Sequence, residues 1–256
     1  MKLRMTLLVV FVVAAILAGC SMQRAQPQEP DLEDGPHTVV LQAAPQEIQE
    51  WVANSLRLFA GQARDHGDRT YLLLTLGEKP TGGYEARISS LSVSGGDLVA
   101  LCRFKEPSPG ETVSQAKTYP FDLVTVPRLE VPVEFRAEGD SPPHIMRVLG
   151  SDVEPIVAES TWIKVFEPRP GQVVAGSFSL RGLCSAFEGT VNYRLMRNSS
   201  ILHEGFATGA MGDWGYFEAV IPLDTAENGP AVLEVFTYSA KDGSVQDLIS
   251  IDVTVE

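Results

Sequence analysis

Alternation of apolar and polar positions dominates the chain from Arg69 onward. Tyr71 to Leu76 is a dense apolar run, whereas Val191 to Leu195 and Ile249 to Val255 alternate strictly between apolar and polar residues. These runs are short and are divided by Gly- and Pro-rich turns, a pattern typical of β-strands. The sequence therefore predicts a mainly β protein.

One segment has helical spacing instead. After Pro45, apolar residues recur at 48, 51, 52, 56 and 59, which predicts one apolar helix face running to about Ala63. The predicted strands around this helix are Thr38–Gln42, Tyr71–Leu76, Arg87–Val93, Leu98–Phe104, Thr112–Thr118 and Phe121–Val126, with Leu129–Arg136 and Ile145–Leu149 as edge candidates. We expect a small antiparallel β domain with one packed helix over residues 37–150 and a core over 39–128.

The rest of the chain, residues 156–256, predicts a second β domain. Seven short strands are expected at Thr161–Phe166, Phe178–Arg181, Gly189–Leu195, Ile201–Phe206, Phe217–Ile221, Val232–Ser239 and Asp247–Val255. The Asp242-Gly243 pair between the last two is a strong hairpin signal. Seven short strands in about 100 residues fit an immunoglobulin-like β-sandwich.

The first 19 residues have the layout of a secretory signal peptide. Lys2 and Arg4 precede an uncharged apolar run that ends at Leu17, and this run is shorter than the roughly 20 residues of a membrane-spanning helix. The ending Leu-Ala-Gly-Cys resembles the lipobox of bacterial lipoproteins, which implies cleavage before Cys20 and acylation of its sulfur (palmitate among the chains). An uncleaved membrane anchor is the alternative.

Residues 20–36 are rich in Gln, Pro and acidic residues, which predicts a flexible tether. The whole chain has 20 Lys and Arg against 33 Asp and Glu, a net charge of −13. Such a chain is repelled by nucleic acid and by anionic lipid headgroups, so we expect no nucleic-acid partner. Membrane contact is expected through lipidated Cys20 alone, which places the protein outside the cytoplasm, lipid-anchored to the bacterial cell membrane.

The remaining cysteines and the histidines show no metal-ligand spacing. Cys102 and Cys184 each follow a leucine and are expected to be free and buried, a disulfide between the two domains being the less favoured alternative. His37, His66, His144 and His203 are scattered along the chain. No metal and no cofactor is expected.

Two family resemblances follow from longer stretches. Leu76 to Tyr84, with Tyr119-Pro120 and Val124, resembles the C-terminal domain of the PrcB family, named for a lipoprotein subunit of a bacterial surface protease complex. The second block is similar to the immunoglobulin-like domain associated with GerMN proteins of spore germination. That likeness is carried by residues 168–171, 187–193, 214–217 and 239–244. Together they imply an envelope lipoprotein and no known reaction.

The loop Lys79-Pro80-Thr81-Gly82-Gly83-Tyr84 is the first candidate site. Two glycines allow close approach by another backbone, and Tyr84 offers a rigid contact, so the loop is a candidate for protein binding. It is also similar to the Asn-Pro-Thr-Thr-Gly-Tyr loop of chagasin-type cysteine-protease inhibitors, which implies insertion into a protease cleft. A plain turn with Tyr84 buried at the start of a strand is the simpler interpretation.

Trp214 and Tyr216 are the second candidate site, because aromatic rings beside glycines can stack on sugars. The simpler interpretation places Trp214 and Phe217 at one end of the sandwich core. Gly139-Asp140-Ser141 lacks the Gly-x-Ser-x-Gly context of a hydrolase nucleophile, and Glu188 with Asp242 shows no catalytic spacing. We therefore expect no catalytic residue and no enzymatic activity.

These observations favour a lipid-anchored binding or scaffold protein of the bacterial envelope, associated with a protease complex or with spore germination. Its expected partner is an envelope protein, a protease being one candidate. The alternatives are a protease inhibitor acting through Lys79–Tyr84 and a cell-wall glycan binder acting through Trp214 and Tyr216.

Overall fold

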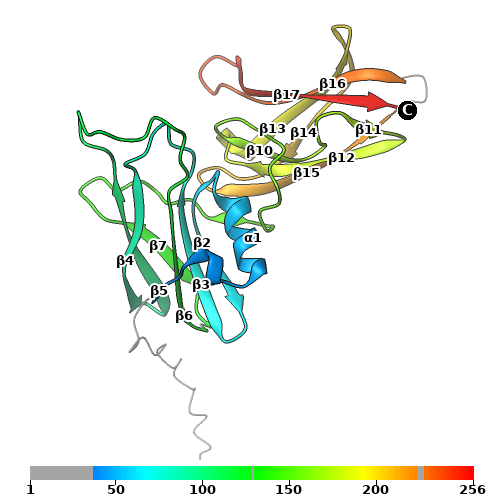
Figure 1. The fold of residues 1–256 in the computed structure, drawn as a ribbon. Helices are drawn as coiled ribbons and strands as arrows, with labels where there is room; N and C mark the ends of the chain where they lie inside the picture. The colour runs from blue at the N-terminus through cyan, green and yellow to red at the C-terminus, as the bar shows by residue number, and fades with distance from the viewer. Residues whose placement is uncertain (1–36, 129, 224–227) are drawn as a thin grey trace, which may run out of the picture.

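The computed structural model describes residues 37–128, 130–223 and 228–256, which form two β-rich domains (Figure 1). The signal peptide, Cys20 and the tether lie outside the described residues. The elements of the first domain are β1 His37–Thr38, η1 Leu41–Ala43, α1 Gln46–Ser55, β2 Phe59–His66, β3 Arg69–Leu76, β4 Glu85–Ser94, β5 Asp97–Lys105, β6 Phe121–Pro127 and β7 Val133–Ala137. Those of the second are β8 Val148–Leu149, β9 Ala158–Glu159, β10 Ile163–Glu167, β11 Gln172–Val174, β12 Ser177–Cys184, η2 Phe187–Gly189, β13 Thr190–Arg197, β14 Ser200–Thr208, β15 Trp214–Pro222, β16 Gly229–Tyr238 and β17 Val245–Val255.

The first domain has three layers. A four-stranded sheet, in the order β1-β6-β3-β2, packs α1 on one face and a three-stranded sheet, β4-β5-β7, on the other. Successive residues of β3 serve the two faces in turn: Leu73 packs under the helix with Ile48 and Trp51, whereas Leu72 and Leu74 face the second sheet. This double burial explains why β3 is apolar throughout.

Three sequence predictions in this domain are wrong. The segment Thr38–Gln42, expected as one strand, is a strand only at His37–Thr38 and becomes a 3-10 helix at Leu41–Ala43. The helix ends at Ser55, and the apolar stripe that seemed to continue it belongs to β2, where Phe59 and Ala60 pack on other partners. Thr112–Thr118 is not a strand: apart from a bridge between Lys79 and Thr118 it is an irregular loop, and most of its side chains are exposed. A segment without an apolar face gains nothing from joining a sheet.

The second domain is a sandwich of two five-stranded sheets, β8-β15-β12-β10-β9 and β11-β17-β16-β13-β14. Its core is aliphatic with Phe178 and Phe217 between the sheets, as the alternation in the sequence predicts. All seven expected strands are present, as β10 and β12–β17. The mainly β fold class, with one packed helix and an immunoglobulin-like domain, is confirmed.

The connection between the domains is hydrogen-bonded to both. Gly61 in β2 donates its N–H to the carbonyl of Met146 at 3.0 Å, and Trp214 in β15 donates its N–H to the carbonyl of Arg147 at 2.9 Å. Val148–Leu149, expected as an edge strand of the first domain, pairs in parallel with β15 of the second. The connection is therefore a shared strand rather than a free linker.

Among the described residues, no helix has the length and apolarity needed to cross a bilayer.

Candidate functional site

Two features lie side by side where the domains meet, a buried seam and an open groove. We use seam for the apolar cluster of Leu58, Ala60, Met146, Val153, Phe166, Leu183 and Trp214. It joins the start of β2, the connection and the second domain's β10-β12-β15 sheet. Because each of these residues is less than a tenth exposed, the seam fixes the two domains against each other.

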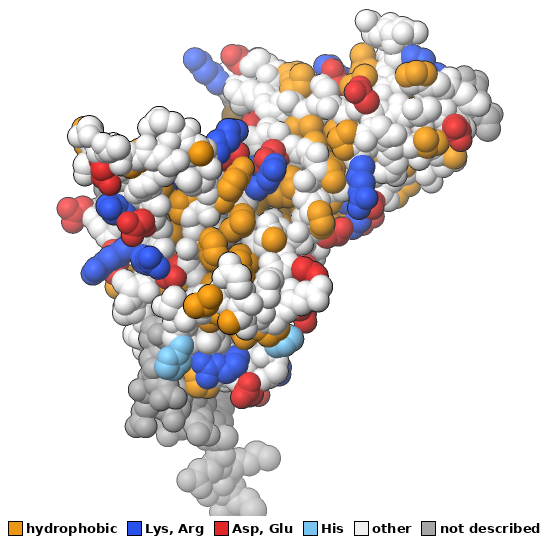
Figure 2. Space-filling model, in the orientation of Figure 1, with side chains coloured by type: hydrophobic (Ala, Val, Ile, Leu, Met, Phe, Trp, Pro, Cys, Tyr) orange, Lys and Arg blue, Asp and Glu red, His pale blue; other side chains and the backbone are white. Residues whose placement is uncertain are grey.

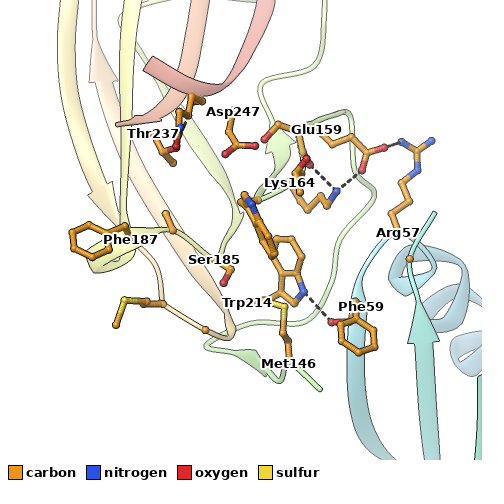
Figure 3. Close-up of a pocket in the computed structure, with 18 of the residues that line it drawn as sticks. Arg57, Phe59, Met146, Glu159, Lys164, Ser185, Phe187, Trp214, Thr237 and Asp247 are labelled. Atoms are coloured by element: carbon orange, nitrogen blue, oxygen red, sulfur yellow. Dashed lines mark hydrogen bonds and ion pairs between the residues drawn. The ribbon is translucent and has the colours of Figure 1, made fainter. Parts of the chain in front are cut away.

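Trp214 is the centre of the seam. It is only 3% exposed, and its indole N–H donates to the carbonyl of Phe59 at 3.3 Å, across the domain boundary. The ammonium of Lys164 lies 5.7 Å from the ring centroid (Figure 3). Its ring therefore has no open face, and the sugar platform expected at Trp214 is not available in this structure. Tyr216, half-buried, packs against the same cluster and donates its hydroxyl to Glu218.

The carboxylate of Asp213 holds the connection between the two domains in place. Its carboxylate accepts hydrogen bonds from the Arg147 backbone N–H at 2.8 Å, from the Arg147 guanidinium at 2.6 and 3.0 Å, and contacts His144 Nε2 at 3.1 Å. Burial alone would raise the pKa of Asp213, but the hydrogen bonds from Arg147 and His144 outweigh it and lower the pKa from 3.8. Asp213 is therefore a structural anion, and it orients His144 at the edge of the groove.

The groove lies beside the seam and has a volume of about 1140 Å³. The first domain lines it with Arg57, which follows α1, with the start of β2 and the end of β3, and with Lys117. The second domain lines it with segments of β9, β10, η2, the residues before β15 and the β16–β17 turn. Figure 2 shows hydrophobic side chains exposed at the junction of the two lobes. Sites between domains are a common location for ligand binding.

Four large apolar residues of the groove are open to solvent. Trp162 is 45% exposed, Tyr238 49%, Phe187 58% and Met211 66%, and all four come from the second domain. Trp162 lies 6.4 Å from Trp214, so neighbouring rings have opposite roles, one structural and one accessible. Aromatic residues and Met are enriched at protein interfaces, which makes this groove the candidate functional site.

The groove wall nearest the first domain carries paired charges. Lys164 Nζ lies 2.8 Å from Glu159 Oε2 and donates to the Ser160 carbonyl at 2.9 Å, and Arg57 forms an ion pair with the same glutamate (Figure 3). Glu159 therefore ties the two domains together through Arg57. The cations on this wall already have carboxylate partners.

Glu78 forms a similar centre further along the same wall. Lys117 Nζ lies 2.6 Å from its carboxylate, and the hydroxyl of Tyr119 donates to it at 2.8 Å. Hydrogen bonds from Lys117 and Tyr119 lower the pKa of Glu78, and the same contacts raise the pKa of Lys117 and of Tyr119. Glu78 and Lys117 are solvent-exposed, so their pairing orders side chains more than it stabilises the fold.

The Lys79–Tyr84 loop links β3 of one sheet to β4 of the other. The loop before β6 covers it: Lys79 and Thr118 exchange backbone hydrogen bonds, Gly82 donates its N–H to Ser114 and Thr118 donates its hydroxyl to the Thr81 carbonyl. Pro80 is exposed, Gly83 has a φ of +85°, and Tyr84 packs on the first core with the Lys79 ammonium 5.5 Å from its ring. The structure thus gives these residues intramolecular partners and does not join them to the aromatic residues of the groove.

The other sequence candidates lie apart from the groove or serve the fold. Cys102 and Cys184 are free and buried, as expected, and burial raises the pKa of the first thiol to about 12 and of the second to about 11. Within the described residues no group of three or more His, Cys, Asp and Glu could hold a metal ion. Sequence reasoning missed Trp162, Phe187, Met211 and Tyr238, because they lie on four separate segments that share no spacing.

Comparison with known families assigns both domains. Residues 70–127, from β3 to β6, match the model described as PrcB C-terminal, and residues 162–244 match Gmad2, the immunoglobulin-like domain of bacterial spore germination. The chain therefore has a segment similar to a PrcB C-terminal domain followed by a segment similar to a Gmad2 domain. The four exposed groove residues all belong to the Gmad2 match, whereas Glu78 and Lys117 belong to the PrcB match. The groove is thus lined by residues from both matched segments.

No curated protein matches the chain. Among solved structures, the crystal structure of an engineered protein aligns with 50% of this chain at 10% identity and a TM-score of 0.27. The alignment spans 22% of that engineered chain.

Proposed function

We propose that this chain is a non-enzymatic, lipid-anchored binding protein of the bacterial envelope that holds a partner protein in the groove between its PrcB and Gmad2 domains. The observation that carries the proposal is the concentration of half-exposed Trp162, Phe187, Met211 and Tyr238 in one groove. Exposed apolar residues gathered in a concave site are typical of interaction surfaces. The descriptions of the two families favour an envelope- or germination-associated role.

The anchoring part of the proposal rests on the lipobox pattern at Cys20. Two or more acyl chains on this cysteine would hold the protein stably on the membrane. A Cys20→Ala chain should lose incorporation of labelled palmitate and retain its signal peptide, whereas Cys184→Ala should be labelled normally. Lipid on the Cys20→Ala chain would contradict the anchoring proposal.

The binding part is tested by photocrosslinking of the full chain in bacterial cells. A photoreactive residue at Met211 should give a discrete crosslinked envelope protein, identified by mass spectrometry. The matched control is the same residue at Val173, which is 54% exposed but lies outside the groove. The same adducts from both positions, or none from Met211, would contradict the groove as the binding site.

A further inference from the structure

Asp247 differs from the other charged groups that line the groove. Arg57, Lys164 and Lys117 all have carboxylate partners, but within the described part of the chain the Asp247 carboxylate has no hydrogen-bond or ion-pair partner. The charge on this side of the groove that has no partner is therefore negative.

The backbone has an unusual conformation at Asp247. It has a φ of +53°, in the left-handed region that side chains rarely adopt, and it lies where the register between β16 and β17 shifts. Such bulges often redirect a side chain next to a binding site. Strands β9 and β17 contact each other here, and Figure 3 shows the Asp247 carboxylate between Thr237 and Glu159.

The surroundings of Asp247 suit an organic cation. Trp162 and Tyr238 line the same groove and are about half exposed, and the faces of aromatic rings attract ammonium and guanidinium groups. The structure already contains this contact on the buried side, where Lys164 lies over Trp214. The net charge of −13 also draws cationic partners towards the protein.

We propose that the groove binds an extended segment of a partner protein through a Lys or Arg side chain, whose charge pairs with Asp247 and stacks on Trp162 or Tyr238. Neighbouring apolar side chains of the segment contact Phe187 and Met211. The volume of about 1140 Å³ exceeds the roughly 300–1,000 Å³ of small-ligand sites and leaves room for these neighbours. This inference rests on the proposed function and specifies the chemistry of its partner.

The test uses the full chain and three capped pentapeptides, Leu-Ala-X-Ala-Leu with X as Lys, Gln or Glu. Binding is followed by tryptophan fluorescence at low ionic strength, because Trp162 is the exposed ring whereas Trp51 and Trp214 are 4% and 3% exposed. The Lys peptide should bind about tenfold more tightly than the Gln peptide, and the Glu peptide most weakly. Salt should weaken the preference.

Asp247→Asn should bring the Lys peptide to the affinity of the Gln peptide, and asparagine suits the positive φ at this position. Asp252→Asn is the matched control, because Asp252 is exposed on the same strand outside the groove. Equal binding of the Lys and Gln peptides would overturn the cationic partner while leaving the groove as a binding site. Failure of all three peptides at millimolar concentration, or fluorescence changes caused only by peptidoglycan oligosaccharides, would overturn the proposal altogether.

Discussion

The seam and the groove contain the same residue types in opposite roles, buried and bonded in the seam but accessible in the groove. In the seam, Trp214 is buried and its indole N–H is bound to Phe59, whereas in the groove Trp162, only 6.4 Å away, is nearly half exposed. Asp213 accepts four contacts from the connection, whereas Asp247 has no partner among the described groups. Residue type therefore does not distinguish a structural group from an available one, but satisfaction of its contacts does.

The largest effect should come from Trp214→Ala. Removing a fully buried ring that bridges the domains should lower the free energy of unfolding by about 3–5 kcal/mol. We also expect two separate calorimetric transitions, because the seam no longer couples the domains. Trp162→Ala is the control and should cost about 1 kcal/mol. If the two variants lost equal stability, the division between seam and groove would be wrong.

Asp213→Asn should have the next largest effect, about 1–3 kcal/mol at neutral pH, because it breaks the ion pair that holds the connection. The folded pKa of Asp213 lies below 3.8, so its stabilising contribution is complete above that value and is lost as the pH falls through the folded pKa. The difference between wild type and variant in urea denaturation should therefore shrink in acid. The same difference for Asp252→Asn should stay near zero, and a pH-independent effect of Asp213→Asn would argue against a charge-based role.

Arg57→Gln should cost less, about 1 kcal/mol or below, although it removes an ion pair between the domains. Arg57 is 45% exposed, and exposed pairs contribute little to stability. The measurement is the urea midpoint at low and at high salt, which should converge as salt screens the wild-type pair. A loss as large as that of Asp213→Asn would mean that the groove wall, like the seam, holds the domains together.

The smallest effect is expected when the folded protein is treated with thiol reagents, because its buried cysteines should not react. Burial raises the pKa of Cys102 to about 12 and of Cys184 to about 11, so neither is a thiolate near neutral pH. In a Cys20→Ser chain we expect no reaction with a disulfide reagent at pH 8 until urea unfolds the protein. Since the two thiols lie in different domain cores, faster labelling of one of them in Trp214→Ala would show which domain opens first.

Local pattern was sufficient for most of the fold and insufficient for the site. The strands of the second domain follow from alternation, because each has one face on the core. The end of the helix could not be read from the sequence, since Phe59 and Ala60 continue the apolar stripe of α1 but pack on different partners in β2. Thr112–Thr118 was misassigned for lack of a buried face.

The groove was beyond local pattern for a different reason. Its exposed residues come from the position just before β10, from η2, from the turn before β15 and from the end of β16, and only the sandwich topology brings them together. The surroundings of Trp214 were also beyond local pattern: the sequence offered a sugar platform or, more simply, one end of the sandwich core, whereas the structure buries the ring in the seam. Its burial depends on contacts with the first domain, 155 positions away along the chain in the case of Phe59.

The shared strand between the domains has a mechanical consequence. Met146 and Arg147 are bonded to β2 on one side and to β15 on the other, in parallel pairings that run along the strands. A force that pulls the domains apart therefore acts on several backbone hydrogen bonds at once. It does not first extend a flexible linker. We therefore expect a force applied to one domain to reach the other through these hydrogen bonds.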